Sequence, residues 1–194
     1  MPTTISVTAH SKPRALREVD PPPPVSVKVN GVEVWPKSVL LAPTTFRLII
    51  FIPNSPPTDP QAYLFDKVLC TPMTKGKDPW SLSYGGLFDF AHNLLYSYGD
   101  PRNLFFLFAT AGFDQGMVPP PSFAQLLFSC GAGSGLQDWL GRTPGQSDQS
   151  MWVSKPANYI FIGSSGTSFK APLLEKFEAG TGDAAVTTKA ECTF

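Results

Sequence analysis

The stretch NLFFLFATAGFD, Asn103–Asp114, is the densest run of large apolar side chains in a chain that is otherwise rich in proline and glycine. A short continuous apolar run of this kind predicts a strand that is buried in a core. At its exit we expect Gly112 to supply a left-handed turn, which Asp114 caps by accepting hydrogen bonds from backbone amides. The alternative is that Thr110 and Asp114 present a hydroxyl and a carboxylate to a sugar or a protein partner.

Further strands are predicted on both sides of this stretch. The alternating pattern from Val25 to Trp35 is interrupted by Asn30-Gly31, the strongest short-range signal for a hairpin. The apolar run Phe46–Ile52 predicts a central strand, and Asn158–Gly163 predicts another buried one. These segments predict a core that is built mainly from strands.

Helices are predicted between the strands. Pro121 and Ser122 start a short helix that Gly131 ends, and Pro172 lies near the start of a later helix. The loop GAGSG at Gly131–Gly135 follows a helix instead of leading from a strand into one, so we read it as flexible and not as a phosphate cradle. The short helix buries Phe123, Leu126 and Leu127, and an earlier one, followed by Gly99, carries an apolar stripe of Leu87, Phe90, Ala91, Leu94 and Leu95.

Residues 1–24 are predicted to form an extended arm, ahead of a globular domain at 25–180 and a tail at 181–194. The arm ends in the tetraproline Pro21, Pro22, Pro23 and Pro24, which favours polyproline II and cannot donate ladder hydrogen bonds. We therefore expect the arm to gain order only by docking on a neighbouring subunit. The tail could add an edge strand or dock on a neighbour.

The charge composition narrows the classes of partner. The formal net charge is zero, with 15 basic and 15 acidic residues, and charged residues make up only 15% of the chain. A nucleic-acid binder needs a basic face, so this class is disfavoured. A surface this poor in charge favours contacts with partner subunits. The sequence shows no signal peptide or membrane span, which predicts synthesis in the cytoplasm, with a virion as a candidate destination.

The residues that carry chemistry form no recognisable constellation. Three cysteines, Cys70, Cys130 and Cys192, have no C-x-x-C spacing, so we expect free, mostly buried thiols, with one long-range bridge still open. Only two histidines exist, His10 and His92, and we expect His92 to bond locally to Asp89. We expect no metal, no cofactor and no enzymatic activity. A non-local acid site drawn from Asp66, Asp78 and Asp138 stays open as a third alternative.

The tryptophans are the strongest candidates for recognition. Trp35, Trp80, Trp139 and Trp152 all fall in or beside predicted loops and turns. An exposed indole is a common platform for a sugar ring or a protein hot spot. The alternative is that some of these rings cover the ends of the core. The candidate binding surface is therefore Trp80, Thr110, Asp114, Trp139 and Trp152.

The order of segments resembles the interleukin-like EMT inducer (ILEI) domain family over roughly residues 46–178. The resemblance implies a non-enzymatic mixed fold of two curved sheets packed face to face, with helices outside. Family members act as secreted signalling proteins or as carbohydrate-binding stem modules, and this chain lacks the signal peptide and paired cysteines of the secreted members. The resemblance rests on LFD at 64–66, FDFAHNLL at 88–95, LFATAGFD at 107–114, FAQLLFSCG at 123–131, NYIFIGSSG at 158–166 and FKAPLLEKF at 169–177.

Together these observations predict an α+β (mixed) protein with an ILEI-like pair of packed curved sheets, two to three outer helices and the Pro-rich arm. We expect a non-enzymatic structural or adaptor component of a multi-subunit assembly, with a virus or phage particle as the setting. The expected partners are other protein subunits. The alternative function is a carbohydrate-binding, lectin-like module whose partner is a glycan.

Overall fold

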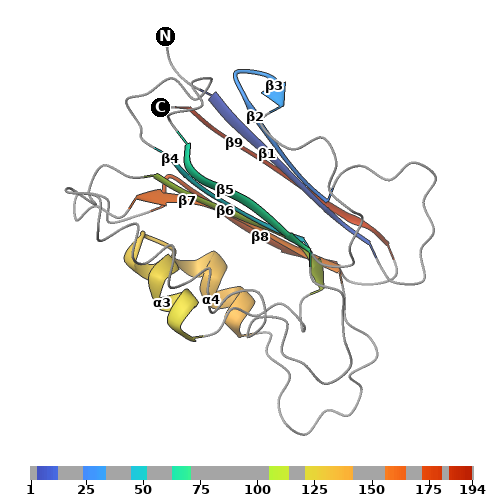
Figure 1. Cartoon of the computed structure of the whole chain (residues 1–194). Helices are drawn as coiled ribbons and strands as arrows, with labels where there is room; N and C mark the ends of the chain where they lie inside the picture. The colour runs from blue at the N-terminus through green and yellow to red at the C-terminus, as the bar shows by residue number, and fades with distance from the viewer. Residues whose placement is uncertain are drawn as a thin grey trace, which may run out of the picture.

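The computed structural model describes residues 4–12, 24–33, 45–51, 63–70, 105–113, 121–141, 156–164, 172–180 and 184–193. These residues form two antiparallel sheets and two short helices, which is a mixed α+β architecture built mostly from strands. Figure 1 shows three layers: a four-stranded sheet, a five-stranded sheet, and the helices α3 and α4 on the far face of the five-stranded sheet.

The four-stranded sheet has the order β3-β2-β1-β9. The hairpin predicted at Asn30-Gly31 is confirmed, because both residues have positive φ, 49° and 80°, and they join β2 to β3. The strands β1, β2 and β9 alternate more buried and more exposed residues, as expected for a sheet with one face on the core, whereas both residues of β3 are exposed. The bounds are β1 Thr4–Ser11, β2 Val25–Val29, β3 Val32–Glu33 and β9 Val186–Thr193.

The prediction that the N-terminal residues form an arm without burial of its own is wrong for residues 4–11. They form β1, which lies between β2 and β9 in the middle of the sheet. Ile5, Val7 and Ala9 are at most 2% exposed, since every second side chain of β1 enters the core. Pro24, assigned to arm docking, is buried in its own chain, and its carbonyl accepts a hydrogen bond from the His10 amide at 2.7 Å. Pro21–Pro23 lie outside the described residues.

The C-terminal segment adopts the first of its two predicted alternatives and forms an edge strand. All eight residues of β9 pair with β1, from Thr4 opposite Thr193 to Ser11 opposite Val186. Segments near the two ends of the chain therefore lie side by side, as Figure 1 shows from the N and C labels. The four-stranded sheet therefore depends on pairing between residues that are far apart in the sequence.

The five-stranded sheet has the order β5-β4-β6-β7-β8. The central position predicted for the second apolar run is confirmed, because β4 lies between β5 and β6. The opening stretch is β6, and Gly112 pairs with Ala157 within the ladder instead of making the turn that we expected. A strand, β8, replaces the helix predicted after Pro172. The bounds are β4 Thr45–Phe51, β5 Tyr63–Cys70, β6 Phe105–Phe113, β7 Pro156–Ser164 and β8 Leu174–Ala179.

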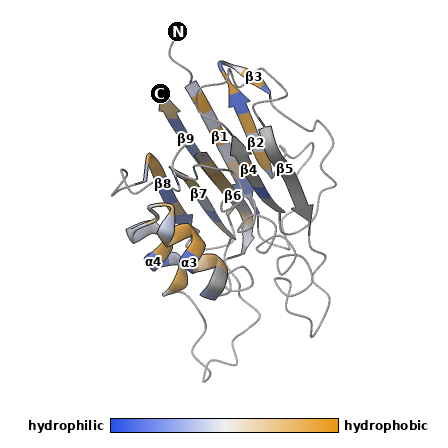
Figure 2. Cartoon of the chain, turned by 60° about the vertical axis from the view of Figure 1, so that its left-hand side comes forward, coloured by the Kyte–Doolittle hydropathy of each residue, from blue (hydrophilic) through white to orange (hydrophobic). Residues whose placement is uncertain are grey.

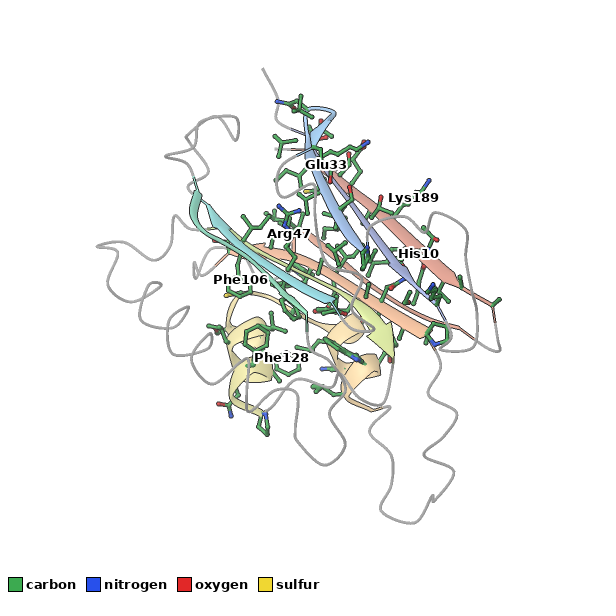
Figure 3. The ribbon with its side chains drawn as sticks, turned by 45° about the vertical axis from the view of Figure 1, so that its right-hand side comes forward. His10, Glu33, Arg47, Phe106, Phe128 and Lys189 are labelled. Carbon is green, nitrogen blue, oxygen red and sulfur yellow. The ribbon has the colours of Figure 1, made fainter. Side chains whose placement is uncertain are left out.

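The strands β6 and β7 are buried on both faces of the five-stranded sheet, which explains their largely apolar sequences. Its aromatic face packs against the helices: the Phe108 and Phe123 rings are 4.9 Å apart, edge to face. Arg47 is only 1% exposed on β4 and lies between the two sheets (Figure 3). The aliphatic face meets the four-stranded sheet in a core of Ile5, Val7, Ala9, Val25, Val27, Val29, Ile49, Leu107, Ala109, Ala111, Ile160 and Ile162.

The helices differ in how well the sequence predicted them. The helix α3, Pro121–Ser129, has the predicted start, its stripe of Phe123, Leu126 and Leu127 is buried, and Gly131 ends it with a φ of 101°. The helix α4, Ser134–Leu140, is not predicted by the sequence, because a Gly- and Ser-rich segment favours a flexible loop. The helix expected around residues 87–95 lies outside the described residues.

Candidate interaction surface

Two of the five residues proposed as a binding surface are buried in the protein's own core, so that assignment is wrong for them. Trp139 is 1% exposed and stacks against the neighbouring rings of Tyr159 and Phe177, with ring centroids 5.0 and 6.4 Å away. Thr110, also 1% exposed, lies on β6 within the five-stranded sheet. The indole supports the packing of α4 on the sheet. Trp139 therefore agrees with the alternative that some of the tryptophan rings cover the core. Trp80, Asp114 and Trp152 lie outside the described residues.

The Gly-rich loop before α4 does cradle an anion, but the anion is the protein's own Glu175 on β8. The carboxylate accepts hydrogen bonds from the amides of Gly133, Gly135 and Leu136 at 2.9 to 3.2 Å. It also accepts one from the Tyr159 hydroxyl at 2.8 Å. Burial raises the pKa of Tyr159, and the charge and hydrogen bond of Glu175 raise it further. The flexible-loop interpretation is therefore wrong, because a tertiary contact satisfies the first amides of α4.

A buried polar network ties the two sheets together near the end of β1. The Asn158 side chain accepts from Ser11 Oγ at 2.7 Å and donates to the carbonyls of Ala9 and Val186 and to the Thr188 hydroxyl. Thr188 in turn donates to Glu178 at 2.7 Å. Every member has a partner, as buried polar groups require, so the network has a structural role.

The end of this network is charged. Glu178 pairs with Lys176 at 2.9 Å. Burial opposes the charged form of Glu178, but the hydrogen bonds from Thr188 and Lys176 and the positive charge of Lys176 lower its pKa below the ordinary value. Lys176 also donates to the carbonyl of Lys189 on β9, at 3.2 Å.

Within the described ranges, the titratable side chains do not gather into a reactive centre. No group of three or more His, Cys, Asp or Glu residues there could hold a metal ion. Cys130 and Cys192 are free thiols, and burial raises the pKa of both, for Cys130 to about 12. Asp138 is exposed on α4, whereas Asp78 and His92 and the side chains of Cys70 and Asp66 lie outside the described part. None of the helices described in the structure has the length and hydropathy to cross a membrane.

The outer face of the four-stranded sheet is a continuous polar surface. It consists of the alternate side chains that point away from the core, and Figure 2 shows them interleaved with hydrophobic residues along β1, β2 and β9. Neighbouring strands are linked by Ser6 to Glu191 at 2.9 Å, Ser26 to Glu33 at 2.8 Å and His10 to Thr187 at 2.8 Å. The face comprises Thr4, Ser6, Thr8, His10, Ser26, Lys28, Glu33, Thr187, Lys189, Glu191 and Thr193, of which His10, Glu33 and Lys189 are labelled in Figure 3.

The backbone of β9 is the second feature of this surface, because β9 is the last strand of its sheet. The amide of His10 bonds to the carbonyl of Pro24, and that of Asn30 to the carbonyl of Thr4, so the even-numbered residues of β1 bond to β2. The odd-numbered residues of β1 must then bond to β9, opposite its even-numbered residues. The amides and carbonyls of Thr187, Lys189, Glu191 and Thr193 therefore point to the outer edge.

Within the described part of the chain, no further strand covers this outer edge, although one of its carbonyls, that of Lys189, accepts a hydrogen bond from Lys176. Among the described residues, β9 pairs only with β1, and its residues facing the outer edge are exposed. The only large hydrophobic side chains exposed in the described part are Val32 and Phe128, so this part of the surface has no extended apolar patch. An exposed edge strand is instead a template for another strand. The sequence predicts an edge strand in this tail as one of two alternatives, but not that it pairs with β1, because that pairing is not visible in local patterns.

A scan against protein-family models and a search of curated proteins found no match for this chain.

Proposed function

We propose that the protein is a non-catalytic structural or adaptor component of a larger assembly, and that it docks by adding a partner strand to the edge of β9. The single observation that carries this proposal is the eight-residue edge strand, whose outward backbone groups are presented on an exposed edge. Strand addition uses such main-chain groups for affinity and the alternate side chains for specificity. The charge-poor composition also favours partner subunits.

The two face-to-face sheets with outer helices agree with the architecture that the ILEI resemblance implies. We propose the ILEI-like fold for this chain on that basis. Docking through a free N-terminal arm is not part of the proposal, because β1 is integral to the sheet. The expectation of a virus or phage particle depended on a free arm, so the structure gives it no support.

Replacement of Glu191 by Pro tests the proposal. Proline removes an amide that points outward from β9, whereas the bonds of β9 to β1 use the even-numbered residues. In the cells that naturally produce the protein, we expect wild type to elute from size exclusion in a complex larger than one chain. The Glu191→Pro variant is expected to elute as a smaller species, while Glu191→Thr, which removes the charge but keeps the amide, is expected to retain most of the complex. Thermal melts of the purified variants check that each is folded.

Wild type that elutes at the size of a single chain contradicts the assembly role. A complex that survives Glu191→Pro contradicts docking at this edge.

The second candidate function is glycan binding, which is favoured by the hydroxyls and carboxylates on the outer face of the four-stranded sheet, such as Ser26 and Glu33. Single-chain elution together with binding of the wild-type chain to a glycan array would make that function the leading one.

A further inference from the structure

We infer that the partner strand at the edge of β9 is β9 of a second copy of this chain, paired antiparallel about a twofold axis at Ala190. The inference rests on the proposed function, because it assigns the partner of the same edge. A twofold contact requires one surface that is complementary to itself. Both the backbone and the charges of β9 meet this requirement.

The backbone restricts the possible registers. In an antiparallel pair, the residues that exchange hydrogen bonds stand directly opposite each other. On β9 these must be the outward residues Thr187, Lys189, Glu191 and Thr193, so an odd-numbered residue must face an odd-numbered residue of the second copy. A twofold axis at Ala190 satisfies this condition. It also uses all four residues, because Thr187 then faces Thr193 of the second copy.

The charges select among the remaining registers. With the axis at Ala190, Lys189 of each copy faces Glu191 of the other, on the outer face of the sheet where both are exposed. With the axis at Lys189, two lysines face each other, and with the axis at Glu191, two glutamates do. Opposite charges across a strand pair stabilise it, and like charges destabilise it. The charges on β9 therefore favour the register centred on Ala190.

Lys176 controls access to this edge. Its ammonium donates to the Lys189 carbonyl at 3.2 Å, and that carbonyl is one of the groups that the second copy must use. Lys176 is a long side chain, 43% exposed and also paired with Glu178, so it can leave the carbonyl at modest cost. A lysine that covers a strand edge limits uncontrolled pairing. We therefore expect a reversible dimer that becomes tighter without Lys176.

Sedimentation velocity of the purified full-length chain over a range of concentrations tests the inference. Lys189→Glu and Glu191→Lys each place like charges opposite one another, and each is expected to raise the dimer Kd by about tenfold or more. The double variant Lys189→Glu/Glu191→Lys restores opposite charges and is expected to return to the wild-type Kd. Lys176→Ala is expected to lower the Kd by a few fold. Thermal melts show whether each variant is folded.

The inference is overturned if wild type and Lys176→Ala are both monomeric at every concentration. It is equally overturned if the single charge changes leave the dimer Kd unchanged, or if the double variant does not return to the wild-type Kd. These outcomes are separable from failure of the proposed function. If the purified chain stays monomeric but is found in a larger complex in its natural cells, the self-pairing is contradicted and the adaptor role is not.

Discussion

Removal of residues 1–12 is expected to abolish cooperative folding, because it deletes the strand between β2 and β9. The deletion exposes the core side chains that met Ile5, Val7 and Ala9, and it removes both of the ladders that β1 forms. Burial of a Val or Ile side chain contributes about 1.5–3 kcal/mol. Together with the lost ladders, the deficit approaches the roughly 5–15 kcal/mol by which a domain is stable.

A matched pair of point variants tests whether the loss of stability comes from the core-facing side chains of β1 or from any change in this strand. Val7→Asp places a carboxylate in the core between the sheets, where Val7 is 1% exposed, and we expect it to unfold the protein. Thr8→Asp changes the next residue, which points outward opposite Lys189, and we expect it to be tolerated. Circular dichroism melts measure both. If the truncated chain and Val7→Asp both melt as wild type does, the N-terminal residues are not part of the core, and the prediction of an unburied arm would be supported.

Replacement of Gly163 by alanine is expected to have the second-largest effect. Gly163 lies on β7 where the end of α3 approaches the sheet, and the Ser164 amide bonds to the Cys130 carbonyl at 3.1 Å. A Cβ at Gly163 would lie 2.2 Å from that carbonyl oxygen and 2.3 Å from the Phe161 ring. A backbone carbonyl cannot rotate away as a side chain can, so the helix must move off the strand. We expect a loss of about 3 kcal/mol or more in the free energy of unfolding.

Urea unfolding measures this loss, with Gly141→Ala as the control. Gly141 is exposed at the end of α4 in a right-handed conformation, with a φ of −66°, and a Cβ there would lie 3.3 Å from the Gln137 carbonyl oxygen. This contact is much looser than the one at Gly163, so we expect its substitution to change stability by no more than about 1 kcal/mol. Equal midpoints for Gly163→Ala and wild type would show that α3 does not pack on β7 in this way.

The sequence predicted those elements whose local pattern matches their environment. The strand β6 is buried on both faces and has a continuous apolar run, and the stripe of α3 has the period of a helix on a core. The hairpin at Asn30-Gly31 needs positive φ at both residues, which these two residue types readily adopt. In each case the information lies within a few residues.

The elements that the sequence did not reveal depend on distant partners. β1 does alternate apolar and polar residues, but it has only three apolar residues, and the tetraproline that follows favours an extended arm. The first amides of the helix α4 donate hydrogen bonds to the Glu175 carboxylate, about forty residues away along the chain. Trp139 was expected at the surface because nothing in its neighbourhood predicted that helix. Trp80, Asp114 and Trp152 stay predictions.

The central claim is that β9 is the edge of a sheet whose middle strand is β1, with the backbone of its odd-numbered residues facing outward. Amide hydrogen exchange resolved by residue measures this directly. In dilute protein, we predict slow exchange at Thr188, Ala190 and Cys192 and fast exchange at Lys189 and Glu191, with slow exchange at Val7 and Ala9 of β1. Rapid exchange throughout β1 and β9, or equal protection of odd- and even-numbered residues in β9, would contradict it.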